Sequence, residues 1–531
     1  MEPLLRRGPA EVHIQSRECD RQILGRFTGA SFFPERLLGW AVISAVGRGG
    51  GALLYVTAPP VLDPDEQIDY YLGLLGPGHG GARSRVRLVG VDDLGPRWLS
   101  EKVLDPDNPQ AAEVREAIRE FLEGHRRGGD DVRLDYFEPS APLERFAREL
   151  GVPGNQPDSS CIPLGTKHSG RRLFAEAGIP VPAGSDELCR SIADIAVEVA
   201  RLARSGHRTV MIKLDDAASG AGLGNALLDL DDLGLSAGKN GADGTSDDES
   251  PAERVLAALP RATLVDPTTT WDDYVRTVEK TGAVVEEWIR DDTLCSPSFQ
   301  GRITDAGAVE AVSTHDQVLG GHGQSYTGCR FPASAEYRHT LLDYGLRIGR
   351  ALREQGVGQG DYGVDFLARR TGGNWQLLGC EINLRGTGTR HAFGIAAAVL
   401  GTRATPDGRL LVAGPGSAER VYECSDSLID PRYAGLRPAR LIRAVTGSPL
   451  GYDPKRATGV VLHMLSAVTY HGKFGAVCIG ADRAETAALM RGLRELVDDL
   501  VDPAHCVAAP DRWDGTPLPG EAARSVPAKR T

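Results

Sequence analysis

The chain has 531 residues, and at roughly 100–200 residues per domain this length predicts three or four domains or subdomains. Hydrophobic residues make up 41% of the sequence and charged residues 25%, which is the composition of an ordinary globular protein. The net charge of −12 argues against a nucleic-acid or anionic-membrane surface that covers much of the protein, because both partners demand a basic footprint; a local basic pocket is compatible with it.

Cysteine usage and the apolar runs indicate the compartment. The nine cysteines are scattered without a CxxC pair, so neither a zinc site nor a disulfide framework is expected. No run approaches the ~20 apolar residues of a membrane span, and no apolar stretch follows Arg6 and Arg7 as in a signal peptide. We therefore expect a cytoplasmic protein with reduced thiols and with neither nucleic acid nor membrane as partner. Homo-oligomerisation is left open.

Short strand patterns alternate with helical spacing through residues 1–155. A buried strand is predicted at 52–56, an alternating strand at 85–90, a helix at 111–122 and another strand at 131–137. Strands that alternate with helices predict an α/β layer domain.

The next stretch begins with a compact helical unit. Thr166 is placed to cap a helix that Gly178 stops. A long amphipathic helix is predicted from about residue 186 to 203, leading into an apolar strand at 209–214. Residues 228–250 are acidic and rich in glycine and serine, which predicts an exposed, flexible insertion.

A lysine followed by a glycine-rich segment is a candidate phosphate-binding feature. Lys213 lies near the end of the apolar strand, and residues 217–225 follow it. Glycine-rich backbone can approach phosphates and donate N–H groups, while lysine adds a point charge. The candidates are Lys213, Ser219, Gly220, Gly222 and Gly224. The spacing is not that of a P-loop, and a glycine-rich turn between strands is the alternative.

Residues 284–289 form an apolar strand that abruptly turns acidic at Glu286 and Glu287, before Ile289. This pattern fits an edge strand or a hinge whose backbone meets a purine. An ordinary strand end remains the alternative.

The strongest constellation is a hairpin pattern made by residues 363–367 and 377–385 around a glycine-rich turn. Side chains alternate across a strand, so Glu381, Asn383 and Arg385 point to one face. The residues between them are apolar and point into a core.

Asp365 on the first strand completes an oxygen-rich site. Two carboxylates with an amide are the ligands that Mg²⁺ prefers, and Arg385 on the same face can hold a phosphate or carboxylate oxygen. A plain two-residue turn at 372–373 would set Asp365 opposite Cys380. For Asp365 to oppose Glu381, the hairpin requires an odd loop or a bulge. A surface hairpin with a polar outer face is the alternative.

The C-terminal part predicts a further unit over residues 416–505. A strand is expected at 475–480, and Asp482 with Glu485 forms a capping-box pair ahead of a helix. The polar, proline-rich residues 506–531 predict a disordered tail.

The order of these features over roughly residues 156–400 resembles the ATP-grasp superfamily, and within it the peptide ligases of the pheganomycin type. The narrower resemblance rests on residues 381–391 and 316–332, and on 459–480, which look like that family's C-terminal domain. It implies an α+β / α/β ATP-grasp fold with a pre-ATP-grasp α/β domain and a small C-terminal α/β domain. The implied segments are 1–155 (N-terminal domain), 156–290 (small subdomain), 291–415 (large subdomain), 416–505 (C-terminal domain) and 506–531 (tail).

The resemblance also implies residue roles. ATP phosphates would be held by Lys167, Lys213 and the glycine-rich residues, and adenine and ribose by Glu286, Glu287 and Ile289. Two Mg²⁺ ions, with Mn²⁺ able to substitute, would bind Asp365, Glu381 and Asn383. Arg385 and Lys213 would act in catalysis. Gln317, His315, Arg390 and His391 are substrate-pocket candidates.

The implied reaction joins a carboxylate to an amine. The γ-phosphoryl of ATP passes to the carboxylate, the amine attacks the acyl phosphate, and an amide, ADP and phosphate result. The substrates are small-molecule or peptide carboxylates and amines. An ATP-grasp small-molecule kinase and a non-catalytic ATP-binding regulator are the alternatives.

Overall fold

A computed structural model describes residues 8–19, 24–25, 28–76, 79–216, 224–233, 250–320, 325–412 and 417–502. The chain forms two compact units. Unit 1 comprises Met1–Gln156, Gly328–Phe331 and Gly388–Thr531, and unit 2 comprises Pro157–Thr327 and Pro332–Thr387. Most of the expected acidic insertion, part of the glycine-rich segment and the expected tail lie outside the described residues. The finer division into five segments stays a prediction.

The N-terminal part of unit 1 is a parallel sheet with strand order β3-β2-β1-β4. The strands are β1 (Ala10–Ile14), β2 (Ala52–Thr57), β3 (Val86–Gly90) and β4 (Val132–Tyr136). The helices are α2 (Leu38–Ala41), α3 (Pro64–Gly73), α4 (Leu99–Leu104), α5 (Pro109–Arg127) and α6 (Ala141–Leu150). Every residue of β2 is buried, as parallel strands covered on both faces require. The expected α/β layer is confirmed.

The C-terminal part of unit 1 is antiparallel, with β15 between the end of β11 and β17, and β16 beyond β17. The strands are β11 (Ser325–Phe331), β14 (Leu410–Leu411), β15 (Glu419–Ile429), β16 (Gly459–His463) and β17 (Lys473–Gly480). The helices are α12 (Arg390–Leu400), α13 (Pro438–Thr446), α14 (Ser466–His471) and α15 (Arg483–Val501).

The start of α15 follows only half of the expected capping box. Asp482 is the N-cap, and its Oδ1 accepts from the backbone N–H of Glu485 at 2.8 Å. The Glu485 carboxylate accepts from the backbone N–H of Ala481 at 2.7 Å rather than from that of the cap residue.

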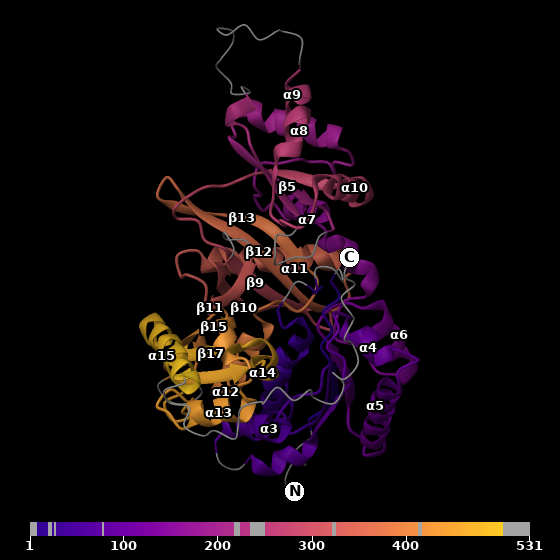
Figure 1. The fold of residues 1–531 in the computed structure, drawn as a ribbon, viewed down its shortest axis with the longest axis vertical. Helices are drawn as coiled ribbons and strands as arrows, with labels where there is room; N and C mark the ends of the chain where they lie inside the picture. The colour runs from indigo at the N-terminus through magenta and orange to yellow at the C-terminus, as the bar shows by residue number, and fades with distance from the viewer. Residues whose placement is uncertain are drawn as a thin grey trace, which may run out of the picture. The chain divides into compact units, whose positions relative to one another are not determined.

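Unit 2 contains a small antiparallel sheet with order β7-β6-β5-β8. Its strands are β5 (Thr209–Leu214), β6 (Asn225–Asp229), β7 (Thr263–Leu264) and β8 (Ala283–Glu287). Its helices are α8 (Ile192–Arg204), α9 (Pro251–Ala258) and α10 (Trp271–Thr281), which are seen around β5 in Figure 1. The helix expected to start near residue 186 begins later, because Ser191 caps it and Cys189 pairs with Ala283 in an extended bridge.

The larger sheet of unit 2 has the order β13-β12-β9-β10 and is antiparallel. Its strands are β9 (Pro297–Ile303), β10 (Val309–Gly320), β12 (Gly360–Thr371) and β13 (Asn374–Asn383). Helices α7 (Lys167–Glu176) and α11 (Arg338–Glu354) share a core with it; Figure 1 shows α11 beside β9 and β12. Thr166 caps α7 as predicted, with its Oγ1 accepting from the N–H of Ser169 at 3.4 Å.

Two bulk expectations concern membranes and thiols. Within the described ranges, no helix combines the length and the apolar character needed to cross a bilayer. None of the cysteines that the structure describes forms a disulfide.

Candidate functional site

The β12–β13 hairpin sets Asp365 directly opposite Glu381. Its turn has two residues, Gly372 and Gly373, with φ of 59° and 85°, the left-handed region that glycine adopts without strain. A register shift next to Asp365 accommodates Cys380 as the extra residue. The bulge that the sequence required is therefore confirmed.

Two polar side chains donate to Asp365, and a third donates to one of these two. Asn383 donates from Nδ2 to Asp365 Oδ2 at 3.1 Å, and Gln317 donates from Nε2 to Asp365 Oδ1 at 2.8 Å. Arg385 donates from Nη2 to Asn383 Oδ1 at 2.9 Å. The structure therefore brings together the acid, the amide and the guanidinium that the sequence singled out, with Gln317 beside them.

Asp365 and Glu381 place two carboxylates opposite each other, and the surrounding side chains do not fully offset their negative charge. Burial raises the pKa of Asp365 to about 6, and the Glu381 carboxylate adds to the rise, although Ser298, Arg385 and Asn383 oppose it. Like charges held this close disfavour ionisation of both groups. A divalent cation would relieve the repulsion, and the carboxylate and amide oxygens suit Mg²⁺.

Both predicted lysines reach this hairpin. Lys167 at the start of α7 has its Nζ 3.7 Å from Glu381 Oε1. Lys213 near the end of β5 forms an ion pair with Glu286 Oε2, and its Nζ lies 4.0 Å from Cys380 Sγ. Two cations from separate elements thus approach the acidic strand end.

Glu286 is a buried anion between two cations, because Arg171 Nη1 also contacts its Oε1 at 2.7 Å. Burial opposes ionisation of Glu286, but Lys213 and Arg171 outweigh it and hold its pKa below the ordinary value. Burial likewise opposes the charge of Lys213, but Cys380 and Glu286 hold its pKa above the ordinary value. The buried pair is therefore ionised.

The remaining described nucleotide-site candidates lie at the ends of strands: Glu287 is the last residue of β8, Ile289 follows it, and Gly224 precedes β6. Glu287 exchanges backbone contact with Ala183, donating its N–H to the carbonyl oxygen at 2.7 Å, and Ile289 is buried. The Gly224 carbonyl accepts from the N–H of Leu214 at 2.9 Å. The candidates Ser219, Gly220 and Gly222 lie outside the described residues.

The other substrate-pocket candidates have internal partners. His315 is buried, and its Nδ1 lies 2.7 Å from Gln300 Oε1. Arg390 in unit 1 donates from Nη2 to Asp135 Oδ2 at 2.9 Å. His391 follows it in the first turn of α12, and burial lowers its pKa to about 3. Substrate roles for these three residues stay predictions.

Three residues near the site were missed in the sequence. Arg171 lies one helical turn after Lys167 on α7, a spacing that puts both on one face and could have identified it. Ser298 lies opposite Asp365 on the neighbouring strand β9. The Asp215 carboxylate accepts from the backbone N–H of His168 at 2.7 Å, which fixes the start of α7. No motif distinguished Ser298 or Asp215.

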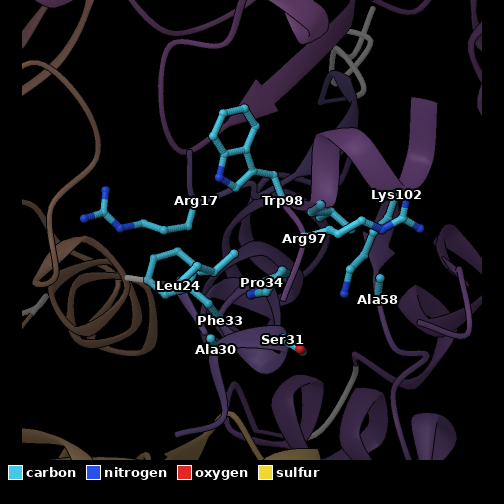
Figure 2. A pocket seen from close by; sticks show the side chains of 11 residues that line it. Arg17, Leu24, Ala30, Ser31, Phe33, Pro34, Ala58, Arg97, Trp98 and Lys102 are labelled. Carbon is cyan, nitrogen blue, oxygen red and sulfur yellow. The ribbon is translucent and has the colours of Figure 1, made fainter. Parts of the chain in front are cut away.

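Unit 1 has a small pocket edged by three cationic side chains, Arg17, Arg97 and Lys102 (Figure 2). Each has a partner within the unit. Arg17 pairs with Glu138, Arg97 Nη2 lies 2.7 Å from Asp93 Oδ2, and Lys102 Nζ donates to the Asp93 carbonyl at 2.7 Å. These contacts account for the three charges as part of the fold.

Two segments match described protein families. Residues 163–374 match the family described as IQCH-like, ATP-grasp. Residues 440–493 match the family described as the PGM1 C-terminal domain. The first match covers the two lysines, Glu286 and Asp365.

One curated relative is similar along most of the chain. It is the L-propargylglycine–L-glutamate ligase of Streptantibioticus cattleyicolor, 32% identical over 434 residues, covering 80% of this chain and 81% of the relative.

Two solved structures are similar to most of the chain. The biotin carboxylase of Campylobacter jejuni in complex with a β,γ-ATP ligand has a TM-score of 0.50 and 12% identity, covering 94% of this chain and 96% of that one. An N5-carboxyaminoimidazole ribonucleotide synthetase in complex with ADP has a TM-score of 0.49 and 11% identity, covering 94% and 99%.

Proposed function

Because the chain belongs to the same ATP-grasp ligase family as the L-propargylglycine–L-glutamate ligase, we propose that it joins the carboxylate of one amino acid to the amine of another. The chain is an ATP-dependent carboxylate–amine ligase, and the proposal specifies the class of its two substrates. The name of this relative gives two α-amino acids as the substrates that it joins, which supports the same class of substrate here. Either partner can also be the end of a short peptide.

The proposed reaction has two steps. A carboxylate oxygen attacks the γ-phosphorus of ATP, so the acyl phosphate forms and ADP leaves. The amine nitrogen then attacks the acyl carbon, the C–O bond to phosphate breaks, and the nitrogen loses a proton as the amide forms. Phosphoryl transfer of this kind needs alignment and charge neutralisation more than covalent help from the protein.

We assign the metal site to Asp365, Glu381 and Asn383. Two Mg²⁺ ions, or Mn²⁺ in their place, would neutralise the phosphate charge when bound there. Asp365 and Glu381 supply carboxylate oxygens from opposed strands. Asn383 and Gln317 hold the Asp365 carboxylate in orientation through their hydrogen bonds.

The cations take the remaining phosphate charge. Lys167 and Lys213 approach the acidic strand end from two elements and are assigned to the α and β phosphates. Arg385, fixed by its bond to Asn383, is assigned to the oxygens of the transferring phosphoryl group and the acyl phosphate. Glu286, Glu287 and Ile289 are assigned to adenine and ribose, and the glycine-rich residues 219–224 to the phosphates.

One observation carries this assignment: Asp365 opposes Glu381 on a bulged hairpin, and Lys167 and Lys213 converge on that same strand end. The acids alone would describe a polar hairpin face. The convergence of two lysines from outside the hairpin supports a site that holds both metal and phosphate.

The substrate class is tested by incubating the full chain with ATP, Mg²⁺ and pairs drawn from a panel of amino acids and dipeptides. ADP and phosphate are measured, and the product mass is read. The proposal expects ADP formation that requires both partners, with a product whose mass is their sum less one water. A stable phosphorylated product would instead indicate a kinase, and the absence of ADP formation with every pair of the panel would reject the substrate class.

The metal site is tested with Asp365→Asn and Glu381→Gln. Each is expected to lower kcat by more than about 100-fold, because groups that merely orient metal ligands already contribute about 10- to 100-fold. The matched control is Asp361→Asn on the same strand, whose carboxylate pairs with Arg302 Nε at 2.7 Å instead. Turnover by Glu381→Gln equal to that of the control would reject the metal assignment while leaving the ligase family intact.

A further inference from the structure

A second cluster of metal-ligating side chains lies in unit 1, apart from the residues assigned above. Its members come from α12, β15 and β16, and all four are buried. They are His391, Cys424, Asp426 and His463. One ligand atom from each lies within 4.8 Å of all the others.

The two contacts of Cys424 Sγ are close to the spacing of ligand atoms around a tetrahedral ion, and the three contacts among Asp426 Oδ1 and the two Nε2 atoms are shorter than that spacing. Asp426 Oδ1 lies 3.0 Å from His391 Nε2 and 2.8 Å from His463 Nε2. The two Nε2 atoms are 3.1 Å apart, and Cys424 Sγ lies 3.8 Å from His391 Nε2 and 3.7 Å from Asp426 Oδ1. With metal bonds of about 2.0–2.3 Å, tetrahedral ligand atoms lie about 3.3–3.7 Å apart.

Hydrogen bonding alone does not satisfy the three shortest contacts. A neutral imidazole has at most one proton on Nε2. If both Nε2 atoms of His391 and His463 are protonated, both can donate to Asp426 but two donors then face each other. If only one is protonated, the other nitrogen still directs its lone pair at a lone pair of the Asp426 carboxylate. A cation among the three atoms makes every contact favourable.

The histidine tautomers are free to present Nε2 as the ligand atom. Among the described residues, neither His391 Nδ1 nor His463 Nδ1 has a hydrogen-bond partner. No neighbour therefore requires Nδ1 to remain an acceptor. The Nε2 lone pairs can face a metal while Nδ1 carries the proton.

The glycine at position 475 leaves space for the imidazole ring of His463. Gly475 pairs with His463 across β16 and β17, and a Cβ at Gly475 would lie only 2.0 Å from His463 Nε2. The β15–β17 register also shifts between Ser425 and Leu428, which places a bulge at Asp426. Bulges of this kind often re-aim a side chain toward a site.

The charges also suit a divalent ion. A Cys424 thiolate and the Asp426 carboxylate would together balance two positive charges. Arg36 donates from Nη1 to the other carboxylate oxygen, Asp426 Oδ2, at 2.8 Å and so orients this ligand from outside the cluster. Partners of this kind are typical around metal-binding carboxylates.

We propose that His391, Cys424, Asp426 and His463 form a closed, four-coordinate site for a divalent transition-metal ion, and that Zn²⁺ fits this donor set best. All four ligands come from the protein and are buried, so the ion is structural and would tie α12 to β15 and β16. The absence of a CxxC pair concealed this site in the sequence.

The first test measures bound metal in the tag-free full chain by mass spectrometry after dialysis against a mild chelator. One zinc per chain is expected. The control variant Cys478→Ser alters another buried cysteine of the same sheet, in β17. Cys424→Ser is expected to lose at least about tenfold in zinc affinity, whereas Cys478→Ser should retain the ion.

The second test measures metal binding in the wild-type chain, so its main result does not depend on whether a variant folds. The metal-depleted wild-type chain is titrated with Co²⁺, and a thiolate-to-cobalt charge-transfer band with the intense visible bands of tetrahedral cobalt is expected. Cys424→Ser should lose the charge-transfer band, and Glu381→Gln should keep it, which separates this site from the magnesium site. A wild-type chain that takes up neither Zn²⁺ nor Co²⁺, or equal uptake by both serine variants, would overturn the proposal.

Discussion

Glu286 shows how one buried charge can organise a site. Its two oxygens contact Arg171 and Lys213, which come from a helix and from a neighbouring strand. Buried ion pairs of this kind add little stability compared with apolar packing, but removing one partner leaves uncompensated charge. The main contribution of Glu286 is therefore to balance the charges of the two buried cations.

Glu286→Gln is expected to destabilise the chain by about 3–5 kcal/mol, because Lys213 and Arg171 would remain buried without a counter-charge. The measurement is the free energy of unfolding from denaturant titration of the purified variant. Asp231→Asn is the matched control, since Asp231 forms an exposed pair with Arg208 at 2.8 Å. Equal loss in the two variants would contradict the buried-charge argument.

At the scale of elements, the start of α7 is held by a carboxylate from another strand end. Asp215 accepts from the backbone N–H of His168 at 2.7 Å, and its carbonyl accepts from the N–H of Lys167 at 3.3 Å. A carboxylate at a helix N-terminus satisfies N–H groups that the helix cannot bond itself. Asp215 thereby links the position of Lys167 to the strand that carries Lys213.

Asp215→Ala is expected to weaken ATP binding by about tenfold, because Lys167 would lose its fixed position while keeping its charge. The loss of helix stability is expected to be about 1 kcal/mol, as for other N-terminal caps. The measurement is calorimetric titration with a non-hydrolysable ATP analogue and Mg²⁺.

The control for this change is Ser191→Ala, which removes the cap of α8, where Ser191 Oγ accepts from the N–H of Asp194 at 3.1 Å. It should cost similar stability without changing nucleotide affinity. If both variants bind the analogue as tightly as the wild type, Asp215 does not position Lys167 for ATP.

The hairpin could be predicted because its information is local. Alternation placed Glu381 and Asn383 on one face, and the parity of the two-residue turn required a bulge, which the structure has at Cys380. The predicted start of α8 was wrong. Acidic residues that are compatible with a helix precede α8, but Cys189 forms an extended bridge with Ala283. Tertiary pairing, absent from a local pattern, decided that boundary.

Contacts between residues that lie far apart in the sequence were harder to predict. Lys213 and Glu286 lie 73 residues apart, and Asp365 meets Gln317 across 48. His391 lies 35 residues from Asp426 and 72 from His463. Family resemblance supplied the first of these groupings. The histidine cluster has no spacing signature in the sequence, so it becomes evident only in the folded structure.

At the scale of the whole molecule, a buried acid connects distant parts of unit 1. Glu35 Oε1 accepts from Gln67 Nε2 at 2.8 Å and from the backbone N–H of Ser466 at 2.9 Å. Burial raises the pKa of Glu35 to about 7, although these hydrogen bonds oppose the rise. The folded chain therefore retains a proton at pH values where the unfolded chain, in which the glutamate pKa has its ordinary value of 4.5, has lost it.

This difference in proton binding gives stability a defined pH dependence. Below about pH 4.5 Glu35 is protonated in both states; between about pH 4.5 and 7 only the folded state keeps the proton, so stability falls as pH rises. The loss is complete above about pH 7 and amounts to about 3 kcal/mol.

Glu35→Gln cannot ionise and should lack this contribution. We expect its free energy of unfolding to fall by about 3 kcal/mol less than that of the wild type between about pH 4.5 and 8. Denaturant titrations across this range check it, with the exposed Glu66→Gln as control. Parallel wild-type and Glu35→Gln curves would show that Glu35 titrates normally in the folded chain.

The discontinuity of unit 1 has a consequence for biosynthesis. Glu35 and Gln67 leave the ribosome long before Ser466, because all of unit 2 is translated between Gln156 and Gly388. At about 5–20 residues per second, this interval lasts on the order of 10 to 50 s. The contact between Glu35 and Ser466 can form only after this interval, so a chain that ends before Ser466 cannot complete unit 1.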